Sequence, residues 1–131
     1  MSDTIQVRVR YAETDNMGYV YYANYLEYFE MARTEYIRKR GKSYKEIEEE
    51  GFLLPVIEVW TKYKKPARYD DLLTIETEVI SIGKASIRFN YFVRNEAGEI
   101  LTEGETKHAL VNKEGNIIPF PEEIRQKLLT S

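Results

Sequence analysis

The side chains that could carry chemistry in this sequence are carboxylates and hydroxyls, because other reactive groups are scarce. The 131 residues contain no cysteine and a single histidine, His108. Cysteine nucleophiles and thiolate metal sites are therefore excluded, and no G-x-S-x-G motif is present to hold a nucleophilic serine. No cluster of His, Asp and Glu has metal-ligand spacing, and no glycine-rich phosphate loop occurs. The remaining chemistry must come from carboxylates, hydroxyls and backbone amides.

Asp15 is the strongest candidate because of where it lies. It belongs to the loop Glu13–Gly18, between an expected strand and the start of an expected long helix. The first N–H groups of a helix have no intrahelical acceptor and lie at its positive end, so they could stabilise negative charge on a thioester oxygen. A nearby carboxylate could attack the carbonyl carbon or activate a water molecule. The alternative is a turn residue that accepts backbone hydrogen bonds.

The spacing of apolar residues predicts the elements that would position this loop. Alternation predicts a strand over residues 5–11, and apolar residues at steps of three and four predict a helix over about residues 23–40. Gly41 is the expected C-terminal cap of this helix. A short helix, four strands and a short closing helix are expected at residues 44–50, 54–64, 73–79, 87–93, 100–111 and 121–129.

These elements predict an α+β fold in a single domain, residues 1–131. Turn-forming residues such as Asp70-Asp71 and Gly83-Lys84 separate the four strands, and tight turns indicate antiparallel pairing. The long helix has to bury its apolar face, from Tyr25 to Tyr36, against that sheet. We therefore expect a curved antiparallel sheet wrapped around one long central helix.

Two blocks of the sequence resemble the 4-hydroxybenzoyl-CoA thioesterase family, and most closely its YbgC/FadM-like acyl-CoA thioesterase branch. The first block, Tyr11 to Tyr25, contains T-D-x-x-G-x-V-Y and then N-Y, and is followed by E-x-A-R at Glu30–Arg33. The second block is P-A-R-Y-D-D at Pro66–Asp71. The similarity runs over about residues 5–112. The resemblance implies a hotdog fold and an enzyme that hydrolyses acyl-CoA thioesters.

The resemblance also implies roles for two residues. Asp15 matches the catalytic carboxylate, as nucleophile or general base, and the backbone amide at Tyr22 is implied to polarise the thioester carbonyl. Members of the YbgC-like branch commonly have histidine at the position of Tyr22. A backbone role survives this difference, because every residue except proline carries an N–H. The tyrosine leaves open whether the acyl group is aliphatic or aromatic.

The expected partners are the acyl-CoA substrate and further copies of this chain. Active sites in such folds form between subunits, so the resemblance implies a homodimer, often paired into a homotetramer. Coenzyme A would enter as part of the substrate, and neither a cofactor nor a metal is expected. The expected substrate-binding residues are Gly18 and Tyr19 in the loop and three basic residues, Lys62, Lys84 and Arg88. Further candidates for a basic rim that binds the phosphates of coenzyme A are Lys64, Lys65 and Arg68. A solvated edge is the alternative for the run from Lys62 to Arg68.

Other polar residues are expected to have structural roles. His108 lies in an expected strand, where a lone histidine is usually a packing or surface residue. Glu30 and Arg33 are one helical turn apart and could pair. Glu13 could act on Asp15 by like-charge repulsion, or it could be solvated.

Composition argues against several other classes of protein. The net charge is -3 and the sequence pI is near 5.4, whereas a nucleic-acid binder is usually basic. No apolar stretch reaches the ~20 residues that span a bilayer, and no signal peptide is evident, so we expect a cytoplasmic protein.

Two alternatives to a thioesterase stay open. One is a hotdog hydratase or dehydratase, which would need a histidine beside a carboxylate, and the other is a non-catalytic acyl-CoA-binding module.

Overall fold

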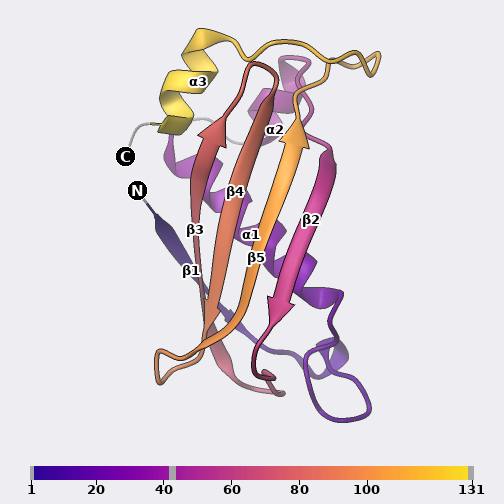
Figure 1. The fold of residues 1–131 in the computed structure, drawn as a ribbon, viewed down its shortest axis with the longest axis vertical. Coiled ribbons are helices and arrows are strands. Elements are labelled where there is room, and N and C mark those ends of the chain that lie inside the picture. The colour runs from indigo at the N-terminus through magenta and orange to yellow at the C-terminus, as the bar shows by residue number, and fades with distance from the viewer. Residues whose placement is uncertain (1, 42–43, 130–131) are drawn as a thin grey trace.

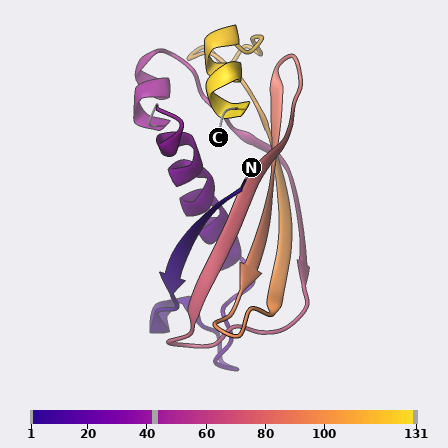
Figure 2. The same ribbon diagram turned by 90° about the vertical axis from the view of Figure 1, so that its left-hand side faces the viewer.

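A five-stranded antiparallel sheet and one long helix make up most of the computed structural model, which describes residues 2–41 and 44–129 (Figure 1). The long helix, α1, lies along one face of the sheet (Figure 2). The predicted α+β architecture is therefore confirmed. The elements in chain order are β1 (Asp3–Arg8), the 3-10 helix η1 (Tyr11–Glu13), α1 (Asn24–Lys39), α2 (Tyr44–Glu49), β2 (Val56–Tyr63), β3 (Leu72–Ile82), β4 (Ser86–Arg94), β5 (Ile100–Ala109) and α3 (Glu122–Leu129).

The strand order is β1-β3-β4-β5-β2, and every neighbouring pair is antiparallel. The expectation that four consecutive strands follow one another through tight turns is wrong for the first of them. β2 pairs with β5 at the far edge of the sheet, not with β3. The segment between β2 and β3 contacts the Asp15 loop instead of closing a hairpin, since Val20 N–H donates to Ala67 O (2.8 Å) in that segment. It therefore crosses the end of the sheet beside the loop that carries Asp15.

The aromatic face of α1 is buried against the middle of the sheet, as predicted. Phe29 stacks on Tyr91 of β4 with 4.3 Å between ring centroids, and Tyr36 meets Phe89 edge-on. At Gly104 of β5, an added Cβ would lie 2.5 Å from the ring of Phe29. A side chain at this position would therefore separate α1 from the sheet.

The helix boundaries follow local chemistry. α1 ends where Gly41, the predicted cap, takes a positive φ of 89° and donates its N–H to Arg38 O. The first strand ends earlier than predicted, because the chain turns into η1 after Arg10. No helix in the described part of the chain is long and apolar enough to cross a membrane.

β2 forms an edge of the sheet (Figure 1). Its side chains are exposed along most of its length. The exposed residues include the apolar side chains of Ile57, Val59 and Trp60. Apolar side chains beside a free strand edge favour pairing with another strand.

Candidate active site

Asp15 lies in a tight loop that its own side chain stabilises. The backbone bonds Asp15 N–H to Tyr19 O (2.8 Å) and Gly18 N–H to Asp15 O (2.9 Å) close the loop, and Gly18 has a φ of +77°. Asp15 Oδ1 accepts hydrogen bonds from the N–H groups of Met17 (2.9 Å) and Tyr19 (3.2 Å). Both bonds use Oδ1, so Oδ2 has no hydrogen-bond partner among the described residues. The turn-forming role considered for Asp15 is thus confirmed, and it leaves one carboxylate oxygen free.

The segment before β3 holds this loop in place. Val20 donates to the carbonyl of the fully buried Ala67, and Tyr19 forms a β-bridge with Arg68. The guanidinium group of Arg68 lies over the ring of Tyr19, 4.7 Å from its centroid. Ala67 and Arg68 belong to the P-A-R-Y-D-D block, which was recognised in the sequence only through the family resemblance. In the structure this block supports the Asp15 loop, a role that no local sequence pattern indicates.

Glu13 is the residue for which the sequence interpretation is least accurate. It is 7% exposed, not solvated, and its carboxylate accepts hydrogen bonds from the Tyr28 hydroxyl (2.9 Å) and from the N–H of Arg10 (2.9 Å). Burial raises the pKa of Glu13, but these bonds and the Arg10 guanidinium outweigh burial and lower the pKa below its usual value. The Glu13 carbonyl accepts bonds from Tyr21 N–H and the Asn24 side chain. Glu13 therefore joins the loop to the start of α1.

The chain just before α1 presents unpaired backbone N–H groups. Tyr21 O accepts the N–H of Asn24 (2.9 Å), and Tyr22 O accepts the hydroxyl of Tyr63 (3.1 Å). The N–H groups of Tyr22 and Ala23 donate to no acceptor within the described residues. They precede the first turn of a 16-residue helix, whose aligned peptide dipoles favour negative charge at this end.

A cleft of about 320 Å³ brings the loop and the helix start together. Of the residues predicted to form the site, the cleft gathers Asp15, Tyr19 and Tyr22, and Gly18 lies in the same loop. The complete lining is Asp15, Tyr19, Val20, Tyr22, Tyr25, Tyr63, Lys64, Lys65 and Pro66. A carboxylate and a helix N-terminus facing one cleft could bind an electrophilic carbonyl group.

The three predicted basic residues do not line this cleft within one chain. Lys62 lies on β2, Lys84 lies in the β3–β4 turn at the opposite end of the sheet from the Asp15 loop, and Arg88 lies on β4 (Figure 1). Arg88 approaches Glu58 and Glu105 at 3.8 Å and 3.7 Å.

Two of the other candidates for the basic rim, Lys64 and Lys65, do lie in the cleft lining. Lys64 pairs with Glu103 (2.8 Å) and Lys65 pairs with Glu99. They carry the positive charge that the lining places around the Asp15 cleft.

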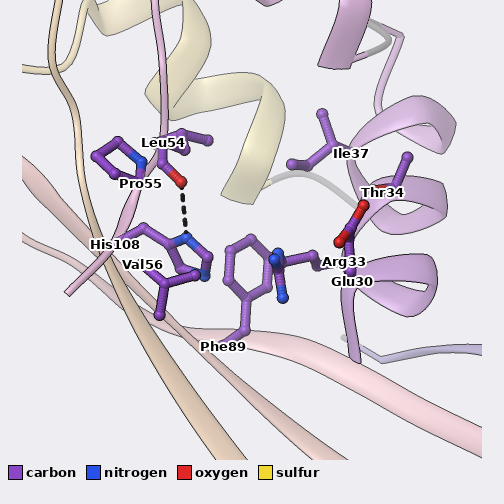
Figure 3. Close-up of a pocket in the computed structure, with 9 residues that line it drawn as sticks. All are labelled: Glu30, Arg33, Thr34, Ile37, Leu54, Pro55, Val56, Phe89 and His108. Atoms are coloured by element: carbon purple, nitrogen blue, oxygen red, sulfur yellow. Dashed lines mark hydrogen bonds between the residues drawn. The ribbon is translucent and has the colours of Figure 1, made fainter. Parts of the chain in front are cut away.

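A second cavity, of about 310 Å³, lies between α1 and the opposite end of the sheet (Figure 3). In Figure 3, Glu30, Arg33 and Thr34 extend from α1, and His108 lies across from them beside Val56. Among the described residues, no ion pair joins Glu30 to Arg33, although their spacing allows one. β2 connects the two hollows, since Val56 at its start lines this cavity and Tyr63 at its end lines the Asp15 cleft.

His108 is a packing residue, as expected. It is 1% exposed, and its Nδ1 and Nε2 atoms lie 3.0 Å from Leu54 O and 2.9 Å from Thr106 Oγ1. Leu54 O can only accept, so Nδ1 carries the proton and Nε2 accepts from Thr106. The pKa of His108 is lowered to about 4, chiefly by burial; the bond to Leu54 opposes this shift, and the charge of Arg33 contributes to it. His108 is therefore neutral near pH 7, and neither nitrogen is free for proton transfer.

Comparison with known proteins shows the family of this chain. The family model of the thioesterase-like superfamily matches residues 9–128. The chain belongs to the thioesterase-like superfamily. This membership confirms the family expected from the two sequence blocks, and with it the expected class of enzyme, a thioesterase.

Named relatives and solved structures agree with the thioesterase-like assignment. The chain is 39% identical to the acyl-CoA thioesterase YbgC of Haemophilus influenzae over 123 residues, covering 91% of this chain and 88% of that protein. It is 38% identical to a putative acyl-CoA thioesterase, YneP, of Bacillus subtilis over 109 residues, covering 83% and 79%. A DHNA-CoA thioesterase from Staphylococcus aureus superimposes with a TM-score of 0.87 at 32% identity, covering 96% and 89%. The predicted hotdog fold is confirmed.

Proposed function

We propose that this thioesterase-like protein hydrolyses acyl-CoA thioesters to a free acid and coenzyme A at the Asp15 cleft. The observation that carries the proposal is that Asp15 and Tyr22 line one cleft. Asp15 offers a free carboxylate oxygen, and Tyr22 offers an unpaired N–H at the start of α1. The names of the relatives support acyl-CoA as the class of substrate.

In this proposal the thioester carbonyl lies between the carboxylate and the helix start. The Tyr22 N–H donates to the carbonyl oxygen and stabilises the negative charge that develops there. Asp15 either attacks the carbonyl carbon, giving a mixed anhydride that water then opens, or removes a proton from the attacking water. In both routes the C–S bond breaks, the thiolate of coenzyme A leaves and takes up a proton, and the acid is released. No cofactor takes part.

The first test replaces Asp15 by Asn, which keeps the Oδ1 acceptor of the loop and removes the charge. We expect hydrolysis to fall by at least about 100-fold, because the nucleophile or base is lost, and the thermal midpoint to change little. Turnover is measured on a panel of aliphatic and aromatic acyl-CoA substrates. Glu114→Gln, an exposed carboxylate in a distant turn, is the matched control.

Two results would contradict the assignment. A folded Asp15→Asn protein with wild-type turnover would remove Asp15 from the chemistry. A wild-type protein that binds acyl-CoA without turning it over would indicate the non-catalytic binding module. A hydratase receives no support, because both ring nitrogens of His108 are hydrogen-bonded within the chain and neither is free to move a proton of the substrate.

The working unit in this proposal is a homodimer formed through the free edge of β2. Its apolar side chains, Ile57, Val59 and Trp60, are about half exposed in the single chain. Antiparallel pairing of β2 with a second β2 reverses the strand, so the Val56 end of one protomer meets the Tyr63 end of the other. The second cavity of each protomer then adjoins the Asp15 cleft of its partner, and we assign this cavity to the acyl group.

The phosphates of coenzyme A are assigned to the basic residues around the cleft. Lys64 and Lys65 contribute within one chain, and Lys62 lies on the adjoining edge strand. Lys84 and Arg88 stay predictions. A role in binding would appear as a raised KM with an unchanged kcat when any of them is replaced by Gln.

A further inference from the structure

Behind the cavity assigned to the acyl group, a chain of hydrogen-bonded side chains offers no negative charge. His108 Nδ1–H donates to Leu54 O, so Nε2 accepts the hydroxyl of Thr106 at 2.9 Å. The Thr106 proton is used there, and Thr106 Oγ1 therefore accepts the hydroxyl of Tyr91 at 2.7 Å. His108, Thr106 and Tyr91 are each at most 2% exposed. This side of the cavity is therefore buried and neutral near pH 7.

Arg33 of α1 brings a positive charge to the buried chain. Burial raises the pKa of Tyr91 and lowers the pKa of His108, and the charge of Arg33 acts to lower the pKa of both. Tyr91 donates its proton to Thr106, so its oxygen can only accept from Arg33. A guanidinium carries five N–H donors, and one hydroxyl oxygen cannot accept them all. Donors of Arg33 therefore remain for a group in the cavity, whose lining includes Arg33.

Glu30, the carboxylate in the same lining, does not neutralise Arg33. Among residues 2–41 and 44–129, Arg33 forms no ion pair. Glu30 is exposed, whereas Arg33 is partly buried. In Figure 3 the Arg33 guanidinium reaches from α1 toward Phe89 and His108, and the Glu30 carboxylate stays beside the helix. The cavity thus has positive charge toward its floor and negative charge at its exposed rim.

A guanidinium without an anionic partner favours a carboxylate over a neutral group. Partial burial costs the charge some of its hydration, and a carboxylate can accept two parallel N–H bonds from one arginine. An alkyl or amide end of an acyl group would leave the charge unpaired. Apolar side chains form the rest of the wall and suit the chain or ring that precedes such a carboxylate; they are Ile37, Leu54, Pro55, Val56 and Phe89.

We propose that the preferred acyl group carries a carboxylate at its far end, which Arg33 binds in this cavity, so that the substrate is the coenzyme A monothioester of a dicarboxylic acid. This inference rests on the proposed hydrolysis at Asp15 and on the assignment of the cavity to the acyl group. The acid released with coenzyme A is then a dicarboxylic acid. Arg33 determines specificity, because it binds the end of the acyl group that is distant from the reacting carbonyl.

The first experiment compares substrates of matched shape and different charge. Adipoyl-CoA ends in a carboxylate, and its isostere with a terminal amide is neutral. The corresponding aromatic pair is 4-carboxybenzoyl-CoA and 4-carbamoylbenzoyl-CoA. We expect the wild-type protein to favour the carboxylate in at least one pair by about 10-fold or more in kcat/KM, because the amide leaves Arg33 unpaired. Equal values within both pairs, or a preference for the amides, would overturn the inference.

The second experiment assigns that preference to Arg33. We expect Arg33→Gln to lower kcat/KM for the carboxylate substrate by about 10-fold or more and to change kcat/KM for the amide by less than about twofold. Arg33→Lys keeps the charge but not the planar fork, so it should retain part of the preference. Arg38→Gln is the matched control, because Arg38 is an exposed arginine of α1 that pairs with Glu35 and lines neither hollow. An equal loss on both substrates in Arg33→Gln would indicate a structural role alone and would contradict the proposal.

Glu30→Gln tests the same arrangement of charges and leaves Arg33 intact. Removing the negative charge at the rim should raise the ratio of kcat/KM for the carboxylate to that for the amide by about threefold. An unchanged ratio would count against the inference even if Arg33→Gln does not fold. If wild type hydrolyses the amides as fast as the carboxylates and Asp15→Asn hydrolyses neither, only the role of Arg33 is refuted. If no acyl-CoA is hydrolysed, or if Asp15→Asn retains activity, the proposed function itself fails.

Discussion

At the scale of single residues, two neighbouring carboxylates have opposite environments. Asp15 keeps one oxygen free at a cleft, whereas Glu13 is buried and bonded to Tyr28 and Arg10. Sequence position made Asp15 a candidate, because it lies in a loop before a helix start, and the family resemblance was needed to favour a catalytic role over that of a turn residue. It could not place Glu13, because the partner Tyr28 lies on the buried face of α1, and only the folded chain brings that face over the loop.

His108 gives a prediction at the same scale. Its pKa is about 4 in the folded protein and near 6.5 when unfolded. Between these values the unfolded chain binds a proton that the folded chain does not, so folding becomes less favourable as pH falls. From pH 7 to pH 5 we expect His108 to remove about 2 kcal/mol of the free energy of unfolding.

The measurement is urea unfolding at several pH values between 5 and 7, with His108→Asn as the comparison. Asparagine can keep hydrogen bonds to Leu54 and Thr106 but does not titrate, so its stability should depend less steeply on pH. Equal pH dependence in the two proteins would show that His108 does not remain neutral in the folded state.

At the scale of elements, sequence patterns located each α-helix and strand to within a few residues but not the partner of β2. Periodicity reports which face of an element is buried, and this was sufficient for α1 and for the β3–β4–β5 meander. The position of β2 depends on what the segment after it contacts. That segment hydrogen-bonds to the Asp15 loop, a contact with no local pattern, so the edge position of β2 could not be predicted.

Gly104 gives the prediction at this scale, because it sets the spacing between α1 and the sheet. An added Cβ would lie 2.5 Å from two ring atoms of Phe29. The ring cannot retreat, since it is fully buried and stacked on Tyr91. We expect Gly104→Ala to lower the free energy of unfolding by about 1–3 kcal/mol, measured by urea denaturation.

A second substitution identifies the cause of that loss. Phe29→Leu removes the ring that the new Cβ would strike, so Gly104→Ala should cost less in the Phe29→Leu background than in wild type. An equal cost in both backgrounds would show that the glycine is needed for another reason.

At the scale of the whole molecule, the Asp15 cleft and the second cavity lie at the two ends of β2, and this arrangement predicts which subunit's cavity receives the acyl group. Thr34 lines the second cavity, so Thr34→Trp should block it, whereas Asp15→Asn leaves it open and removes the carboxylate. Each variant alone should be inactive as a homodimer. The two chains carry different tags, are co-expressed, and are purified as a heterodimer by tandem affinity steps.

The heterodimer decides which subunit supplies the cavity. If the acyl group enters the partner's cavity, one of its two sites combines an intact Asp15 with the open cavity of the Asp15→Asn chain, and about half of the wild-type activity returns. If the cavity serves the Asp15 of its own chain, both sites are defective and the heterodimer is inactive. An active Thr34→Trp homodimer with an unchanged thermal midpoint would exclude the cavity from acyl binding altogether. Strand reversal about a two-fold axis requires the first result, because it brings the end of each β2 to the start of the other.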